Sequence, residues 1–371
     1  MKIRKAIIFL VVILIIVKII FAFPFFKNLE CKAQDMLFRI RGKLPTTDNI
    51  AIIAIDDASF SALDETWPFP RDYHSKLIEN LNKAGVKQII FDVEFTENSF
   101  PESDLRLAKT AAKYQNVIFA GKVLPSQHPG EPTQMIPPIN AILDYNLPWG
   151  IVNMGAEPDG FIRKYTLFEE FDQSKLYSLG IASLANLRVY QSTYADHIKV
   201  ADRTLHLTDK SIPIIDKNKA LINFRGPSGT YPSVSYASVL DDSTFFMPGY
   251  QGAELNELYD IIESGILKDK IVLVGATIDE LHDKFPTPYG GEWTSGVEIQ
   301  ANFIDMVLTD SYLKELNLWL YLLVEIILLI GLWFLFKLIK PQFSAIALIG
   351  LLIIEFIVTY LLFSSSNIIC P

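Results

Sequence analysis

Apolar stretches long enough to cross a membrane lie near both ends of the chain, and short apolar and polar segments alternate between them. Residues 6–23 are apolar apart from Lys18, whose long side chain can carry its ammonium group to the membrane interface. A cleaved signal peptide would have a shorter apolar core followed by small residues, whereas Phe-Pro-Phe-Phe-Lys closes this stretch. We therefore expect an uncleaved transmembrane helix at residues 6–23.

Two further apolar segments, residues 318–339 and 343–363, are each long enough to span a membrane. A short basic turn, residues 340–342, separates them, and residues 1–5 are also basic. Because positive residues favour the cytoplasmic side, residues 1–5 and 340–342 should be cytoplasmic. The pattern predicts a multi-pass protein of the cytoplasmic membrane, with residues 24–317 and the tail 364–371 outside.

Glu325 and Glu355 lie inside the two C-terminal spans, where a carboxylate is costly. Each could face a helix partner, within one subunit or between two, which would allow a homodimer. A tilted helix that brings each glutamate near an interface is an equally good interpretation.

The external region begins with a connector, residues 24–45, which contains a short helix ended by Pro45. Unbroken apolar runs then predict strands buried on both faces, and segments with helical spacing alternate with them. The expected order is strand 50–55, helix 72–84, strand 88–95, helix 104–114 and strand 116–121. This alternation implies right-handed crossovers and a mostly parallel sheet.

After a proline-rich surface excursion at residues 125–148, the pattern changes. We expect a short strand near Ile151, a strand at 161–168, a helix at 177–188, antiparallel strands within 196–224, and a final strand 270–275 with helix 296–307. The fold class is therefore α/β: one extracytoplasmic domain with a mostly parallel sheet flanked by helices, plus three transmembrane helices.

Charge narrows the range of partners. Without the six basic and two acidic residues of the terminal segments, residues 24–317 hold 27 basic and 40 acidic residues, a net charge near −13. Such a surface argues against nucleic acid as a partner and against a broad grip on anionic lipid, so membrane lipid contacts only the spans. Cys31 and Cys370 are the two cysteines, which excludes a disulfide framework.

Polar residues gather where the predicted parallel strands end, the usual place for a ligand site in such a sheet. Asp56 and Asp57 follow the first strand, Asp92 closes the second, Thr277 follows the last, and Asp283 lies in the loop beyond it. These residues are our ligand-binding candidates. The alternative is structural, because loop aspartates commonly cap backbone groups.

Further candidates lie in stiff turns: Trp67 and Arg71 flank prolines before a helix, and Arg163 and Arg225 lie in turn motifs. The favoured interpretation, however, is structural: Trp67 packs over the core while Arg71 pairs with a nearby loop carboxylate. No histidine lies near a second ligand at zinc spacing, and no serine lies in a nucleophile elbow. We expect no metal, no cofactor and no catalytic residue in this chain.

Eight segments together resemble one family: Ile55-Asp56-Asp57 with Ser59, Trp67-Pro68 with Pro70-Arg71, Ala84-Gly85, Phe91-Asp92 with Phe95, Asp159-Gly160 with Arg163, and residues 223–227, 270–277 and 296–302. They are similar to the CHASE domain of the second type over about residues 28–310. This resemblance implies a bacterial inner-membrane sensor, because the family serves adenylate and diguanylate cyclases, histidine kinases and serine/threonine kinases.

The chain departs from that family in two places. Gln300 stands where the family more often has histidine, and two spans follow the sensor where family receptors usually have three and then an output domain. We expect either a receptor whose output lies beyond Pro371 or a stand-alone sensor that signals through a cytoplasmic cyclase or kinase partner.

The leading hypothesis is a receptor module that binds an unknown small-molecule or envelope ligand. A non-signalling envelope scaffold that binds a protein or cell-wall partner is the alternative. An external hydrolase is a weaker third, since no nucleophile constellation is present in the sequence.

Overall fold

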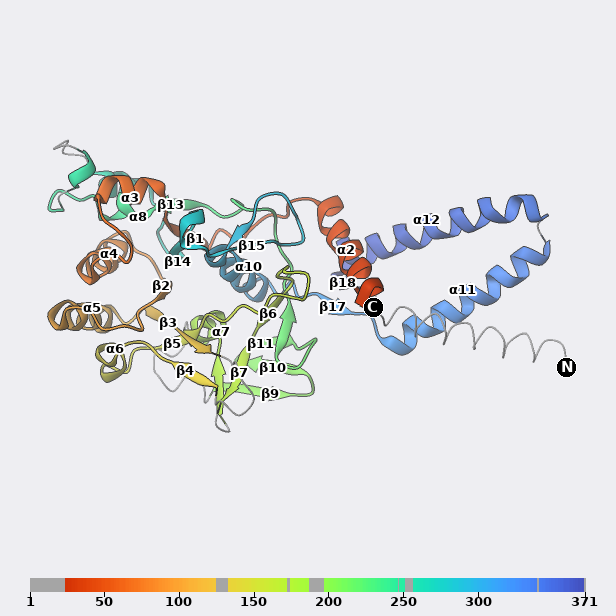
Figure 1. Ribbon diagram of the computed structural model, residues 1–371, viewed down its shortest axis with the longest axis horizontal. Coiled ribbons are helices and arrows are strands. Elements are labelled where there is room, and N and C mark those ends of the chain that lie inside the picture. Colours follow the sequence, from red (N-terminus) through yellow and green to blue (C-terminus); the bar gives the residue numbers. More distant parts are fainter. Residues whose placement is uncertain are drawn as a thin grey trace. The chain divides into compact units, whose positions relative to one another are not determined.

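The computed structural model describes residues 24–124, 133–171, 174–186, 197–245, 247–250, 256–338 and 340–369 (Figure 1). The chain divides into two compact units. Residues Lys43–Ser311 form an α/β unit, and the segments on either side of it, up to Gly42 and from Tyr312 onward, form a helical unit.

A seven-stranded sheet is the centre of the α/β unit, with strand order β13-β1-β14-β2-β3-β4 and β5 paired to β3. The bounds of these strands are β1 Ile50–Ile55, β2 Gln88–Glu94, β3 Val117–Leu124, β4 Gln134–Ile136, β5 Trp149–Ile151, β13 Ser233–Ser235 and β14 Ile271–Ala276. Every pairing is parallel except that of β3 with β4. The apolar run of β1 is buried at all six positions, as expected of a strand covered on both faces.

Helices cover the two faces of this sheet, and Figure 1 shows them on opposite sides of β2 and β3. One face carries α3 Asp57–Leu63, α4 Arg71–Lys83, α5 Pro101–Tyr114 and α8 Tyr236–Leu240. The other face carries α7 Leu179–Asn186 and α10 Gly296–Leu308, which pack against each other. Successive residues of a strand point to opposite faces of the sheet. Ile53 and Val274 therefore pack in the core on the α4 side, whereas Gly275 faces α10.

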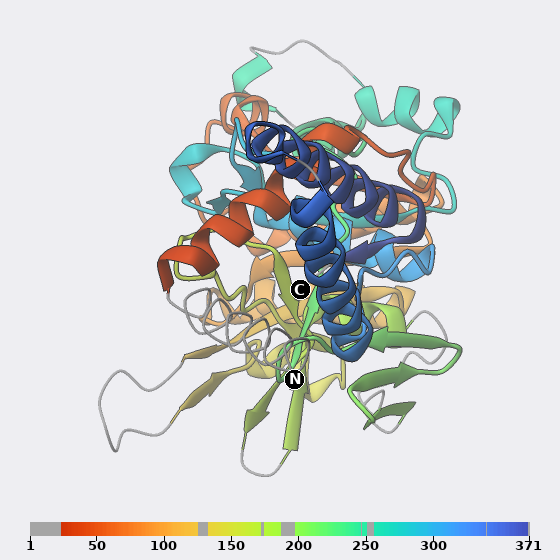
Figure 2. The same ribbon diagram turned by 90° about the vertical axis from the view of Figure 1, so that its right-hand side faces the viewer.

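Shorter strands and helices complete the unit. The antiparallel sheet of β9 Ile198–Ala201, β10 Thr204–Leu207 and β11 Lys210–Pro213 is drawn in green in Figure 2 and confirms the alternation expected within 196–224. The remaining elements are α6 Asn140–Asp144, β6 Lys164–Thr166, β7 Phe168–Phe171, β8 Ser174–Tyr177, β12 Lys219–Leu221, η2 Pro248–Tyr250, α9 Glu257–Ser264, η3 Asp279–Leu281, β15 Lys284–Phe285 and β16 Thr294–Ser295.

The structure corrects two expectations from the sequence. Residues 161–168 are not one strand, because β6 pairs with β12 whereas β7 turns back on β8. The stretch 125–148 is not wholly irregular, since β4 and α6 lie within it and Ile139 and Ile142 are buried in the core. Short elements of three to five residues carry too little periodicity to be read from sequence alone.

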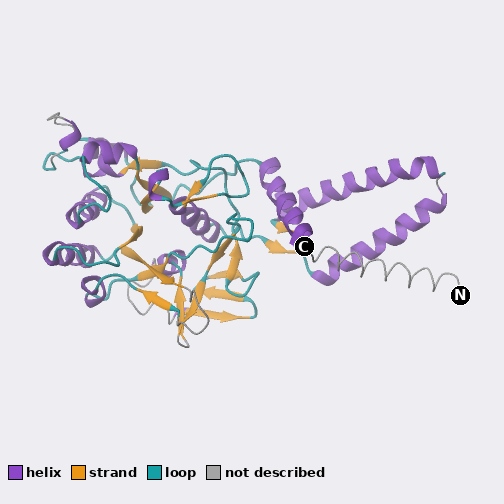
Figure 3. Ribbon diagram, viewed as in Figure 1, coloured by secondary structure: helices purple, strands orange, loops and turns teal. Residues whose placement is uncertain are grey.

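The helical unit contains α2 Pro24–Arg41, α11 Leu318–Leu338, α12 Pro341–Ser366, and the short parallel pair β17 Lys314–Glu315 with β18 Ile368–Ile369. Figure 3 colours these long helices purple. By length and composition, two helices of the described residues can cross a membrane, Leu318–Leu338 and Phe343–Ser366, with mean hydropathy of 2.4 and 2.6. The sequence predicts three; the first predicted span, residues 6–23, lies outside the described residues.

Candidate functional site

The chain leaves the two neighbouring strands β1 and β14 toward opposite faces of the sheet. After β1 it enters α3 and α4 on one face, and after β14 it enters α10 on the other. Loops therefore diverge at the carboxyl edge between these strands, which is where open α/β sheets bind ligands. A cavity of about 220 Å³ lies at this edge. Its lining residues are Ile52, Ala54, Asp56, Ser228, Gly229, Tyr231, Ser233, Thr277, Lys284, Ser295 and Glu298.

Two of the sequence candidates, Asp56 and Thr277, line this cavity. Asp56 also caps α3: its Oδ1 accepts hydrogen bonds from the Ser59 backbone N–H at 2.9 Å and from the Ser235 hydroxyl at 2.8 Å. The backbone N–H of Thr277 donates to the Ile55 carbonyl at 3.1 Å, which ties the loop after β14 to the end of β1. The sequence offers capping and ligand binding as alternatives for Asp56; the structure shows the capping role, at a residue that also lines the cavity.

Glu298, in the first turn of α10, is a cavity residue that the sequence reasoning missed. Its two carboxylate oxygens accept hydrogen bonds from the backbone N–H groups of Gly229 at 3.0 Å and Thr230 at 2.7 Å. Burial raises the pKa of Glu298, and these N–H groups partly offset the rise. An acidic residue at a helix N-terminus is a signal in the sequence, but its contact with a loop near residue 229 is visible only in the fold.

Asp92 and Asp283 form a carboxyl pair on the α10 side of the sheet. Two glycines leave room for these carboxyl groups. A Cβ at Gly275 would lie 3.3 Å from the Cβ of Asp92, and a Cβ at Gly296 would lie 2.4 Å from Oδ2 of Asp283. Burial, aided by the charge of Glu94, raises the pKa of Asp283 to about 7. Burial and the neighbouring Asp283 raise the pKa of Asp92, while the amide of Gln300 partly offsets the rise.

Gln300 joins this pair to a buried hydroxyl. Its Oε1 accepts a hydrogen bond from the Tyr165 hydroxyl, whose oxygen accepts one from the Gly180 backbone N–H at 3.0 Å. Burial raises the pKa of Tyr165, so this hydroxyl stays protonated and acts as a donor at neutral pH. Gln300 is thus a neutral side chain in a buried polar network.

The candidates on the opposite face of the sheet, Asp57, Trp67 and Arg71, lie in a helix turn, on the core and in an ion pair. Asp57 is an exposed residue in the first turn of α3. Trp67 is half-buried against Phe69, with ring centroids 5.4 Å apart, so it packs on the core. The buried Arg71 pairs with Asp104 at 3.4 Å and donates to the Glu97 carbonyl. Its partner carboxylate belongs to helix α5 rather than to a loop.

Arg163 and Arg225 are also buried among partners. Arg163 pairs with Glu157 at 2.7 Å and Asp159 at 2.9 Å, which closes the turn before β6. Arg225 donates to Asp305 Oδ1 through Nε at 3.0 Å and through Nη2 at 2.8 Å. The structure therefore brings Asp56 and Thr277 to one cavity and Asp92 and Asp283 to an adjacent pair, whereas Asp57, Trp67, Arg71, Arg163 and Arg225 lie elsewhere.

Among the described residues, no group of three or more His, Cys, Asp or Glu side chains is arranged to hold a metal ion. What the fold presents is a mostly parallel α/β unit with a small polar-lined cavity at its switch point, in a chain with helices apolar enough to cross a membrane. These features define a class of protein: a membrane-linked α/β domain with a cavity at the edge of its sheet.

The family model for the CHASE2 domain matches residues 8–339, so the chain belongs to the CHASE2 domain family. CHASE2 is an extracytoplasmic sensory domain and is typically non-catalytic, which implies that this protein senses a signal. No curated protein and no solved structure matches the chain.

Proposed function

We propose that the α/β unit binds a small molecule in the cavity at the β1–β14 switch point and transmits binding across the membrane to a cytoplasmic cyclase or kinase. The cavity itself is the observation that carries this proposal, because its walls combine β1, the start of β13, the loop after β14 and the start of α10. Asp56, Lys284 and Glu298 provide charged groups of both signs, which suits a polar ligand.

The segment after β12 supports a route from this cavity to the two ends of the unit. Tyr231 lines the cavity, and its hydroxyl lies 3.3 Å from Oδ2 of Asp305, to which it donates. The same Oδ2 accepts from the Thr47 backbone N–H at 2.9 Å, near the start of the unit. A ligand that displaces Tyr231 would thus disturb a carboxylate that holds the entering chain.

Arg225 extends this route to the exit of the unit. Its carbonyl accepts a hydrogen bond from the Leu44 backbone N–H at 2.6 Å, and its Nη2 donates to the Ser311 hydroxyl at 2.8 Å. Leu44 and Ser311 lie next to the boundaries where the chain enters and leaves the unit. A signal requires the ligand to favour one arrangement of these ends over another, and that free-energy difference limits the response.

Helix α2 supports a homodimer as the signalling form. Leu29, Ala33, Met36 and Ile40 are exposed, with exposed fractions of 55%, 51% and 44% for Leu29, Met36 and Ile40. Their spacing of four, three and four residues is that of alternating d and a positions in a heptad, which form the contact stripe of a coiled coil. Two copies anchored in one membrane would present this stripe in parallel.

Cysteine cross-linking tests the dimer. In a protein with Cys31→Ser and Cys370→Ser, Met36→Cys should form a disulfide-linked dimer in membranes under mild oxidation. Lys32→Cys, which lies off the stripe, is the matched control and should cross-link less. Equal cross-linking at both positions would contradict an ordered α2 pair.

Thermal unfolding of the full chain in detergent, against small metabolites and divalent ions, tests the binding function. A ligand that binds only the folded state raises its apparent stability by about 2.7 kcal/mol at a concentration of about 100 Kd. The shift should be lost in Thr277→Val, which removes a cavity hydroxyl, and kept in Thr204→Val, which changes the antiparallel sheet.

A stabilising compound that acts equally on both variants would place the binding site elsewhere. Absence of any stabilising compound would instead favour the envelope scaffold, whose partner is a protein or cell-wall polymer. An output domain or an adjacent cyclase or kinase in the coding sequence would favour the sensor.

A further inference from the structure

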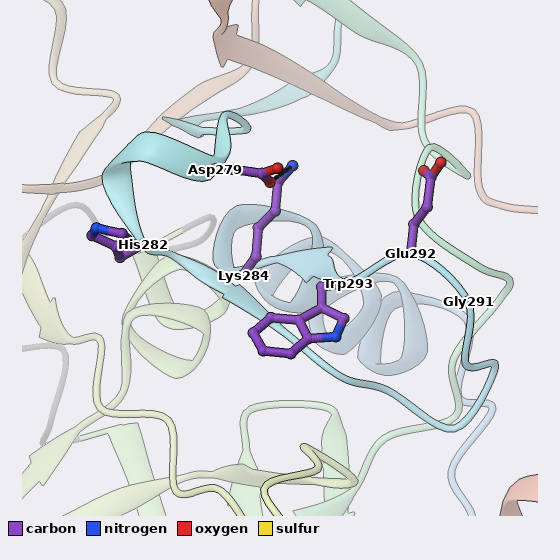
Figure 4. Close-up of a pocket in the computed structure, with 6 residues that line it drawn as sticks. All are labelled: Asp279, His282, Lys284, Gly291, Glu292 and Trp293. Atoms are coloured by element: carbon purple, nitrogen blue, oxygen red, sulfur yellow. Dashed lines mark ion pairs between the residues drawn. The ribbon is translucent and has the colours of Figure 1, made fainter.

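A second, larger cleft lies beside the switch-point cavity on the loop between β14 and α10. Its volume is about 810 Å³, and it is lined by Asp279, His282, Lys284, Gly291, Glu292 and Trp293 (Figure 4). This volume is within the range of roughly 300–1,000 Å³ typical of small-molecule sites. Lys284, in β15, lines both spaces, so the two are adjacent at this residue.

Trp293 gives this cleft an exposed aromatic surface. Its exposed fraction is 58%. An indole is a large apolar group, and a ligand that covers it lowers the free energy by removing that surface from water. Lys284 pairs in register with Ser295 of β16, and Trp293 directly precedes β16, so both residues belong to this hairpin region. Figure 4 shows the indole below the Lys284 side chain, at the lower side of the lining residues.

The charges around the indole favour a positive ligand. Lys284, which lines the cleft, is neutralised by Asp279, whose Oδ1 lies 2.5 Å from its ammonium nitrogen. Glu292 is exposed and forms no ion pair among the described residues, so its carboxylate remains available. The surrounding region has an excess of acidic residues, which attracts cations and repels anions.

We propose that this cleft binds a small organic cation, an amine or a quaternary ammonium group, against the indole of Trp293, with the carboxylate of Glu292 adding to the negative potential of the cleft lining. The negative face of an indole attracts a cation, and an alkylated ammonium loses less hydration than a metal ion when it contacts an apolar ring. This site is separate from the switch-point cavity and does not require the function proposed for that cavity.

Site-resolved ¹⁹F NMR of the full chain in detergent, labelled with 5-fluorotryptophan, tests the proposal. The chain has five tryptophans, and Trp293→Phe identifies the resonance of interest. Tetramethylammonium should shift that resonance in a saturable manner, whereas its neutral analogue tert-butanol should not. Sodium at equal ionic strength provides the baseline.

Two matched variants test the role of charge. Glu292→Gln should weaken tetramethylammonium binding by about 3- to 30-fold, the effect of losing about 0.7–2 kcal/mol. Glu280→Gln removes an equivalent exposed charge outside the cleft lining and should change the affinity little. Measured by calorimetry on folded protein, Trp293→Leu should weaken binding by a similar factor to Glu292→Gln.

Several results would overturn the proposal. Equal shifts with tetramethylammonium and tert-butanol would indicate apolar contact alone. Tighter binding in Glu292→Gln would indicate a site for anions. Divalent-ion binding that persists in Trp293→Leu, without tetramethylammonium binding in the native chain, would assign the cleft to metal ions.

Discussion

Arg225 and Asp305 illustrate how a single buried pair can hold distant segments of the chain together. Asp305 is fully buried at the end of α10, and Arg225 reaches it from the turn after β12 through two hydrogen bonds. The hydroxyl of Thr309 also accepts a hydrogen bond from the guanidinium group. Removing one partner of such a pair leaves the other charge buried without compensation.

We predict that Arg225→Met lowers the free energy of unfolding by about 3–5 kcal/mol, measured by urea unfolding of the full chain in detergent. The control is Arg106→Met, which removes an exposed pair with Asp72 at 3.4 Å and should cost about 0–1 kcal/mol. Comparable losses in the two variants would show that burial of the Arg225 pair does not determine its contribution.

A second residue-scale prediction concerns pH and Asp283. Because the pKa of Asp283 is about 7 in the folded protein and about 4 when unfolded, the native state holds more protons between these values. The free energy of unfolding is therefore higher at low pH, where Asp283 is protonated, and it falls as the pH rises through that window.

Asp283→Asn should accordingly raise the unfolding temperature at pH 8 more than at pH 5. Three pKa units correspond to at most about 4 kcal/mol, and relaxation around the pair reduces this figure. Asp92→Asn, which removes the other carboxyl of the pair, should have an effect of the same sign. A pH profile identical to that of the native chain would refute the raised pKa.

Residue types at strand ends were readable in the sequence, but their roles were not. Asp56 and Thr277 were expected near a ligand site, and they line one cavity because β1 and β14 are hydrogen-bonded neighbours. Trp67 and Arg71 have equally suggestive sequence surroundings, yet they pack against the core on the other face. Whether a side chain after a strand reaches the cavity depends on which face of the sheet the following helix covers. No local sequence pattern encodes that choice.

At the scale of elements, the close approach of β14 and α10 depends on Gly275. A Cβ there would lie 2.7 Å from the Cβ of Val297, which is closer than packed carbon atoms normally approach. This contact places the start of α10, with Glu298, over the carboxyl edge of the sheet. The glycine is therefore a packing requirement of the cavity wall.

We predict that Gly275→Ala costs about 1–3 kcal/mol in unfolding free energy through overpacking. Val297→Ala in the same chain should recover part of that loss, because it removes Cγ2 of Val297, which would lie 2.9 Å from the new methyl group, while Cβ remains. Thermal unfolding of the two single variants and the double variant forms the required cycle. Strictly additive losses would mean that the helix and strand do not collide.

Element boundaries followed the sequence where periodicity was long. The structure confirms strand Ile50–Ile55, and α4, α5 and α10 agree with the expected helices to within three residues at their ends. The short β13 and α8 were not predicted, although β13 is an edge strand of the main sheet and α8 covers one face. Their three and five residues gain stability from packing rather than from local propensity.

At the scale of the whole molecule, the charge of the terminal segments predicts the orientation in the membrane. In a background without Cys31 and Cys370, Lys113→Cys on the exposed face of α5 should react with a membrane-impermeant maleimide on intact cells. Lys340→Cys, between α11 and α12, should react only after permeabilisation. The reverse pattern would place the sensory unit in the cytoplasm.

The sequence by itself determined the class of the fold and the membrane segments near the C-terminus, because both depend on composition and period over long stretches. Apolar runs of six residues predict buried strands, and two long apolar helices can satisfy every backbone hydrogen bond within a bilayer. The family resemblance rests on the same extended pattern of motifs and agrees with the match over residues 8–339.

Only the tertiary structure decided which polar residues share a site. It inserted β14 between β1 and β2, although β14 is the last strand of the sheet in the chain, and so brought Thr277 to Asp56 and Asp283 to Asp92. It also placed Trp293 in one cleft with Asp279 and His282. Strand order is set by packing between segments far apart in the chain, so the sites that depend on it cannot be read from local sequence.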